Sequence, residues 1–198
     1  MKKGFDSIRE KRVLFFYGGG DLTIGKKYAI LYSSANLTFL GGFDMNRKQF
    51  FDLIMTVCDW DAMGDDDAVL KPLLEHLAQQ SDELIFAFDE IMSELLFELD
   101  TKKNFKKACK YHPHSEDSFL YSRCCALING KKYYEDVKAG KSTDLWTMEF
   151  EAILYVPMEA WCLKHGEISD NYPYVATKSY ETGSNVDGWK LRLFGKRK

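Results

Sequence analysis

The stretch SDELIFAFDEIMSELLFEL, residues 81–99, constrains the fold more than any other part of the sequence. Its apolar residues recur at three- and four-residue intervals, which is the spacing of one face of an α-helix. Ser81 stands at the N-cap position, and the acidic residues after it suit the positive end of the helix dipole. The apolar stripe consists of Leu84, Ile85, Phe88, Ile91, Met92, Leu95 and Leu96. Such a stripe must be buried, so the chain must build a helical core around it.

Helical spacing continues on both sides of this stretch, so we expect a helical body over residues 46–166. Its last part, residues 142–166, predicts one long helix with a kink at Pro157, because proline inside a helix removes a hydrogen bond. Glycines that adopt a left-handed conformation at low cost are expected to end three helices. They are Gly130, Gly140 and Gly166.

The N-terminal part has a different pattern. Residues 12–40 contain the runs RVLFFY, KYAILYSS and LTFL, separated by glycines, and predict a β-hairpin or a three-stranded meander. Residues 170–198 are rich in loop-forming residues, and residues 189–194 are compatible with an added strand. We therefore predict one α+β domain over residues 1–198, with a mainly helical body and a small antiparallel N-terminal sheet.

The composition excludes several classes of protein. Hydrophobic residues make up 45% of the 198 residues, which indicates a packed globular chain. The net charge of −3 does not suit an overall nucleic-acid binder. The five cysteines are odd in number and form no C-x-x-C pair, which is typical of reduced thiols. No apolar run has the length of a membrane span, so we expect a cytoplasmic protein without a membrane partner.

A glycine-rich stretch, YGGGDLTIGKK at residues 17–27, resembles a phosphate-binding loop. Such a loop needs a serine or threonine after its lysine and a helix after that, whereas Lys27 and the β-type run YAILYSS follow here. We interpret the stretch as a hairpin loop. LIFAFDE, at residues 84–90, resembles a strand that ends in a catalytic acid, but its helical spacing favours a core helix.

Acidic residues gather in the stretch DWDAMGDDD, residues 59–67. The stretch starts like an EF-hand loop, but Met63 and Leu70 stand where calcium ligands are needed. It is therefore either a solvated loop or a patch that docks a basic partner. The expected partner contacts are Asp59, Asp61, Asp65, Asp66 and Asp67.

Two further clusters have weaker implications. Cys109, His112 and His114, with Cys124 or Cys125, form a loose zinc-like set, but the usual paired spacing is absent and we expect no metal. The lysines of TKKNFKKACK, residues 101–110, share one helical face, which is either solvated or binds a phosphate-rich or acidic partner. No motif for nucleophilic catalysis is present, so the sequence predicts no catalytic residue and no cofactor.

Three segments together resemble a bacterial domain family of unknown function, the one numbered forty-two forty. They are QFFDLI, LLEHLAQQSDELIFAFDEIMSELL and EDSFLYSRCCALINGKKYYEDVKAG, within about residues 49–165. Phe51 replaces a tryptophan of the first family motif, Tyr121-Ser122 replace an aromatic residue of the last, and Cys125 replaces its tryptophan. The last motif maps onto Asp117, Phe119, Arg123, Ile128, Gly130 and Tyr134. The resemblance implies a small helical bacterial domain, of a kind often found in accessory or toxin-immunity settings, and implies no catalytic residue.

Arg123 is the most informative position of that motif, because it lies in the apolar helix FLYSRCCALI. A buried arginine needs a partner, and Asp89, Glu90 and Asp117 are the expected ones. The arginine either forms a structural salt bridge or binds a ligand.

Three functions therefore remain open. The first is a non-enzymatic protein-binding module, most concretely an immunity protein that neutralises a cognate toxin through the acidic stretch. The second is an enzyme or sensor that binds an anionic small molecule in a helical pocket around Arg123. The third is nucleic-acid binding through the lysine face and the GKRK tail, which predicts steeply salt-dependent binding and conflicts with the net charge.

Overall fold

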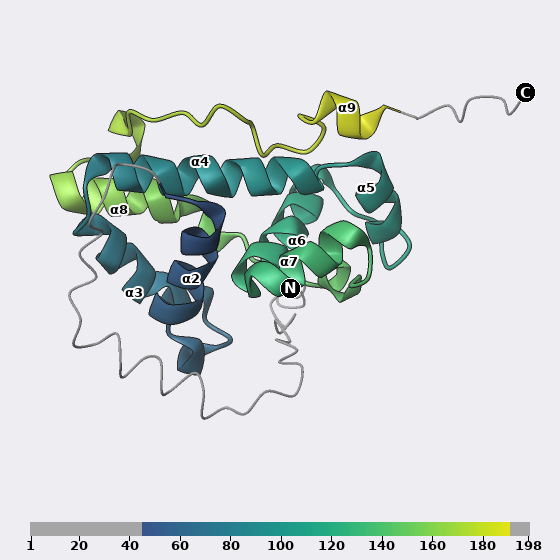
Figure 1. The fold of residues 1–198 in the computed structure, drawn as a ribbon, viewed down its shortest axis with the longest axis horizontal. Coiled ribbons are helices and arrows are strands. Elements are labelled where there is room, and N and C mark those ends of the chain that lie inside the picture. The colour runs from purple at the N-terminus through teal and green to yellow at the C-terminus, as the bar shows by residue number, and fades with distance from the viewer. Residues whose placement is uncertain (1–44, 191–198) are drawn as a thin grey trace, which may run out of the picture.

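The computed structural model describes residues 45–190, and every regular element in this range is a helix. Figure 1 shows their arrangement. The α-helices are α2 (Arg47–Val57), α3 (Asp66–Ala78), α4 (Asp82–Leu99), α5 (Lys102–Ala108), α6 (Glu116–Ile128), α7 (Gly130–Ala139), α8 (Val156–His165) and α9 (Val186–Trp189). The 3-10 helices are η1 (Trp60–Ala62), η2 (Asp144–Thr147), η3 (Ala152–Tyr155) and η4 (Ser169–Asn171).

The predicted α+β class is wrong, because residues 45–190 contain helices and no strand. The hairpin or meander expected over residues 12–40, the glycine-rich stretch and the GKRK tail lie outside the described residues. The strand expected from residue 189 is contradicted at its start, since Trp189 ends α9. A helical turn forms there because the Asn185 side chain accepts a hydrogen bond from the Gly188 N–H at 2.9 Å, as an N-cap does.

Most predicted helices and their ends are confirmed. The stretch 82–99 is one helix, α4, and the Ser81 hydroxyl accepts a hydrogen bond from Leu84 N–H at its start. The segment that resembles a strand with a catalytic acid lies inside this helix. Left-handed backbone angles follow α6, α7 and α8, which explains the glycines at these three places. The φ angles are +84° at Gly130, +78° at Gly140 and +67° at Gly166.

The single long helix predicted over residues 142–166 is wrong. The chain forms η2, an extended stretch, η3 and then α8, and Pro157 lies in the first turn of α8. Proline costs little there, because the first N–H groups of a helix have no partner within it. The extended stretch is held on α6, where Ser122 donates to the Met148 carbonyl at 2.8 Å. Tertiary contacts thus replace helical hydrogen bonds in this segment.

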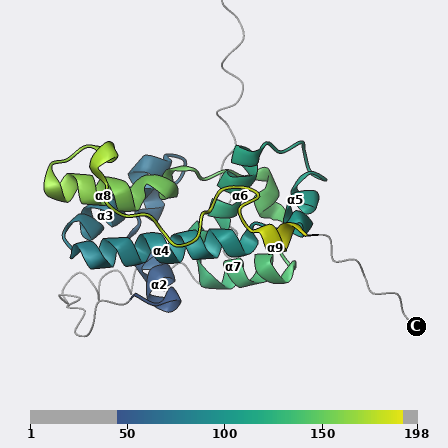
Figure 2. The same cartoon turned by 90° about the horizontal axis from the view of Figure 1, so that it is seen from above.

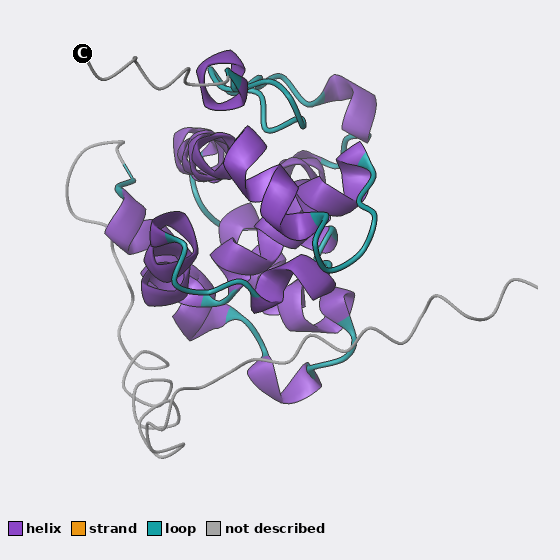
Figure 3. Cartoon of the chain, turned by 90° about the vertical axis from the view of Figure 1, so that its right-hand side faces the viewer, coloured by secondary structure: helices purple, strands orange, loops and turns teal. Residues whose placement is uncertain are grey.

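Helix α4 is the central element of the described fold (Figures 1 and 2). Helices α3 and α8 pack on each other and on the N-terminal half of α4, and α6 packs against α4 toward the other end. The view in Figure 3 shows helices and loops packed around one interior. The largest fully buried side chains are Trp146, Arg123, Tyr134, Phe50, Phe88, Phe119 and Phe150. All of them are apolar or aromatic except Arg123.

Residues 172–189, which we call the C-terminal strap, leave α8 through η4 and run along α4 to α9 (Figures 1 and 2). Helix α9 then packs near α5. Between Tyr172 and Thr177 the side chains alternate between partly buried and exposed, as in an extended chain that lies on a surface. The strap therefore covers part of the helical body without joining a sheet.

Candidate functional site

Five aspartates, which we call the acidic edge, lie between the end of α2 and the first turn of α3. They are Asp59, Asp61, Asp65, Asp66 and Asp67. Two of them have a local structural role as helix N-caps. The Asp59 carboxylate accepts from Asp61 N–H, and the Asp65 carboxylate accepts from Ala68 N–H, each at 3.1 Å. These two bonds satisfy N–H groups at the starts of η1 and α3.

The acidic edge carries negative charge that no described cation neutralises. None of its five carboxylates forms an ion pair with a residue in the range 45–190. Partial burial, followed by the charges of Asp67 and Asp65, raises the pKa of Asp66 above its usual value. Burial and the Asp67 charge also raise the pKa of Glu159 on α8, so the negative surface extends to that helix. Met63, in the middle of the edge, is 55% exposed.

The zinc-like set is not assembled. Within residues 45–190 no group of three or more His, Cys, Asp or Glu side chains is arranged to hold a metal ion. Cys109 is exposed whereas Cys124 is fully buried, so these thiols do not meet at one surface. The two ring nitrogens of His114 lie 3.0 Å from the Trp146 carbonyl and 3.2 Å from the Ser118 hydroxyl.

The lysines of residues 101–110 lie on and just after α5. Burial, followed by the charges of Lys103 and Lys110, lowers the pKa of Lys107 below its usual value. These three ammonium groups are therefore close enough to repel one another, as the shared helical face predicts. Lys103 and Lys110 are exposed.

Arg123 is fully buried, but its partners differ from the predicted ones. None of Asp89, Glu90 and Asp117 forms an ion pair with it. Its Nη1 donates to the Leu96 carbonyl at 2.8 Å, and its Nη2 donates to the Thr182 hydroxyl at 3.0 Å. The prediction that one of these three acids forms a salt bridge with Arg123 is wrong.

The contacts of Arg123 give it a structural role at the end of α4. The Leu96 carbonyl belongs to the last turn of α4, whose carbonyls lack helical partners and carry the negative end of the dipole. The guanidinium carbon lies 4.9 Å from the centroid of the Phe119 ring, which covers one face of the group. Burial lowers the pKa of Arg123, and the charges of Asp100 and Glu181 act in the opposite direction. Arg123 thus joins α6 to α4 and to the strap.

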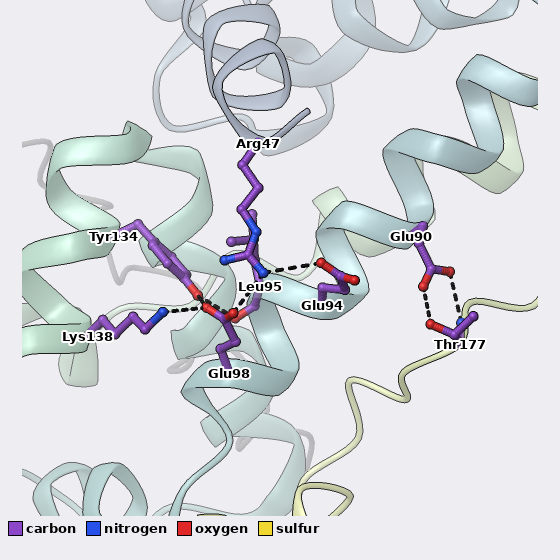
Figure 4. A network of polar contacts seen from close by, with 8 residues as sticks. All are labelled: Arg47, Glu90, Glu94, Leu95, Glu98, Tyr134, Lys138 and Thr177. Atoms are coloured by element: carbon purple, nitrogen blue, oxygen red, sulfur yellow. Dashed lines mark hydrogen bonds and ion pairs between the residues drawn. The ribbon is translucent and has the colours of Figure 1, made fainter. Parts of the chain in front are cut away.

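Two of the acids expected near Arg123 hold the strap instead. The Tyr172 hydroxyl donates to the Asp89 carboxylate at 3.0 Å. Glu90 accepts from the Tyr174 hydroxyl at 2.6 Å. It also accepts from the Thr177 N–H at 2.9 Å (Figure 4). The polar side of α4 is therefore a docking face for the extended part of the strap.

Asp100, directly after α4, anchors the far end of the strap. Its carboxylate is fully buried and accepts from Gly183 N–H at 3.0 Å, Asn185 N–H at 3.0 Å and the Trp189 indole N–H at 2.7 Å. A buried carboxylate needs such donors, because hydrogen bonds replace the water that it has lost. This carboxylate joins the turn before α9, and Trp189 of α9, to the end of α4.

Glu98 is the centre of a second polar network, which Figure 4 shows. It accepts from Arg47 at 2.7 Å, from the Tyr134 hydroxyl at 2.8 Å and from Lys138 at 2.7 Å. Burial disfavours the ionised carboxylate, but the donors outweigh burial and lower the pKa of Glu98 to about 2. The network joins α2, α4 and α7. Glu94 also pairs with Arg47, at 3.2 Å, so two cations face two anions, and this balance of charge indicates a structural role.

Sequence reasoning missed Glu98 and Asp100. For Glu98 a signal exists, since Glu94 and Glu98 are four residues apart and lie on one side of α4. For Asp100 no local pattern indicates the role, because its donors lie more than 80 residues later in the sequence. Only the folded chain brings them together.

Comparison with known proteins identifies a family. A family model described as "Protein of unknown function (DUF4240)" matches residues 45–181, which is well over half of the chain. No curated protein and no solved structure matches the chain. The match confirms the resemblance seen in the sequence and extends it into the strap. Separately, none of the helices in residues 45–190 has the length and apolar character of a membrane span. The chain is a member of the DUF4240 family.

Proposed function

We propose that this protein is a binding module that acts through the acidic edge on a basic protein partner, most concretely as an immunity protein that neutralises a cognate toxin. The observation that supports the proposal is the set of five carboxylates without a described counter-ion around the exposed Met63. Neutralisation by binding needs only a complementary surface that covers the partner's working site.

The edge has the physical properties that a recognition surface needs. Unneutralised charge of one sign attracts an oppositely charged partner and accelerates association. An exposed methionine offers a flexible apolar side chain that can enter a pocket of the partner. The caps formed by Asp59 and Asp65 order the loop before binding, which reduces the entropic cost of association.

A tagged pull-down at moderate salt, from the cells that produce the protein, tests binding. The informative variant is Asp61→Lys with Asp67→Lys, because both side chains are exposed and neither caps a helix. The matched control is Glu135→Lys with Asp170→Lys, which changes the net charge equally at exposed positions elsewhere. We expect the first pair to retain much less of the partner than the wild type does, and the control to retain as much as the wild type. Equal binding by both variants would place the interface elsewhere.

Neutralisation needs a separate test with the captured partner. The partner is expressed alone and with this protein, and cell growth is measured. We expect arrested growth with the partner alone, rescue by the wild type, and poor rescue by the Asp61→Lys, Asp67→Lys variant. A partner that binds but does not arrest growth would support a binding module and contradict the immunity role.

A further inference from the structure

On one edge of the Arg123 guanidinium, one of the two hydrogen-bond donors has an acceptor among the described residues and the other has none. In this planar group the Nε–H and one N–H of Nη2 point along the same edge, which is the fork that carboxylates and phosphates bind with two parallel hydrogen bonds. Nη2 donates to the Thr182 hydroxyl at 3.0 Å, whereas the buried Nε has no hydrogen-bond partner among the described residues. Nη1, on the other side, is occupied by the Leu96 carbonyl.

We propose that this edge of Arg123 is an oxyanion site, which takes a carboxylate or phosphate group, and that Thr182 occupies it when no ligand is bound. A buried donor without a partner costs free energy, and a neutral hydroxyl satisfies only one of the two donors on the edge. An oxyanion satisfies both and supplies the charge that the arginine lacks within hydrogen-bonding distance. The site lies away from the acidic edge and does not depend on the proposed immunity function.

Thr182 sits in the site as a ligand would. Its hydroxyl accepts from Arg123 and donates to the Glu116 carbonyl at 2.8 Å, so it bridges two turns of α6. Glu181, the residue before it, contributes a negative charge that favours the charged arginine. The Phe119 ring closes one face of the guanidinium. The strap thus offers Arg123 one oxygen and a nearby negative charge, which are the two features of an oxyanion.

Only a short turn has to move to open the site. The Ser184 hydroxyl donates to the Ser179 carbonyl at 2.6 Å and the Ser184 N–H donates to the Glu181 carbonyl at 3.1 Å, so residues 179–184 form a closed turn. The strap is fixed before this turn at Glu90, and at the end of the turn Asp100 holds Gly183 N–H and Asn185 N–H. Residues 179–182 can therefore lift from Arg123 while the strap stays on α4 on both sides of them.

The test follows the Nε–H signal of Arg123 by nuclear magnetic resonance in the full-length protein. Inorganic phosphate and acetate are titrated separately, with sodium chloride at equal ionic strength as the reference. We expect a saturable shift with at least one of the two anions and none with chloride. The Thr182→Ala variant removes the competing hydroxyl, so its affinity should rise about tenfold, the value of one hydrogen bond to a charged group. The control is Thr56→Ala, whose exposed hydroxyl has partners only within α2 in the described part of the chain.

Each outcome of the titration either supports or overturns the oxyanion site. A shift with phosphate alone assigns the site to phosphorylated ligands, and a shift with acetate alone assigns it to carboxylates. The absence of a saturable shift in both the wild type and Thr182→Ala would overturn the proposal, as would equal affinities of these two proteins. Arg123→Lys lacks both the two-donor edge and the Nε–H signal, so its titration is followed by the backbone amide signal of Thr182, which should show no saturable shift. If that variant does not fold, the comparison of the affinities of wild type and Thr182→Ala still tests the proposal.

Discussion

Replacing Glu98 by glutamine tests whether the network in Figure 4 stabilises the fold. Glutamine keeps the shape of the side chain but removes the charge that Arg47 and Lys138 bind. The buried Tyr134 hydroxyl is not left without an acceptor, because the Leu95 carbonyl lies 3.0 Å from it. The change therefore measures the charge of Glu98 with little disturbance of the packing.

The magnitude follows from the pKa of Glu98. Lowering this pKa from 4.5 to about 2 corresponds to about 3 kcal/mol of stabilisation of the ionised form. The Glu98 side chain is 28% exposed, but Arg47 and Lys138 are 41% and 43% exposed, so solvent screens part of this energy. We expect Glu98→Gln to lower the free energy of unfolding by about 2 kcal/mol at neutral pH.

The pH dependence has a defined sign. The pKa of Glu98 is lower in the folded protein than in the unfolded chain, so its contribution is complete above about pH 4.5. The contribution is lost as the pH falls toward about 2, because the folded carboxylate then takes up its proton. The difference between wild type and Glu98→Gln should shrink over the same range.

The assay is urea unfolding followed by far-ultraviolet circular dichroism at neutral pH and at about pH 3. The matched control is Glu94→Gln, which removes the same charge from a side chain that is 40% exposed. Among residues 45–190 this side chain accepts only from Arg47, at 3.2 Å. We expect this control to change the stability by less than about 0.5 kcal/mol. Equal losses in both variants, or a Glu98→Gln loss that does not depend on pH, would refute the reasoning.

Three further predictions concern the helix ends and the strap. Asp100→Ala leaves three donors of the strap without their buried acceptor and should lower the free energy of unfolding by about 2–4 kcal/mol. Limited proteolysis within the strap should become faster, and an unchanged rate would contradict the anchoring role. Gly130→Ala should lower the free energy of unfolding, measured with urea, by about 1–2 kcal/mol. The reasons are the φ angle of +84° and the distance of 2.9 Å between the added methyl group and the Met55 sulfur. An unchanged stability would show that this turn relaxes. Asp65→Ala should cost about 1 kcal/mol through loss of the α3 cap, whereas Asp67→Ala should stay within about 0.5 kcal/mol; equal losses would rule out capping as the reason.

The sequence carries local information well in this protein. The apolar stripe of residues 84–96, the cap at Ser81 and the left-handed glycines predicted helices that the structure confirms. Family membership was also visible, because short motifs survive in sequence order. The failures lie where a residue's role depends on distant partners. Local spacing predicts one helix over residues 142–166 with a kink at Pro157. The contact between Ser122 and the Met148 carbonyl, which holds part of this segment extended, has no local signal in the sequence.

Spacing and composition are enough to locate most helices of the body, the charge of the acidic edge and the burial of Arg123. The partners of the buried and partly buried polar groups depend on the tertiary contacts. Asp89 and Glu90 hold the strap, Asp100 anchors its end, and Arg123 joins α4 to Thr182. The physical reason is that helix formation depends on neighbours three or four residues apart, whereas a buried charge takes whichever donor or acceptor the packing brings within 3 Å.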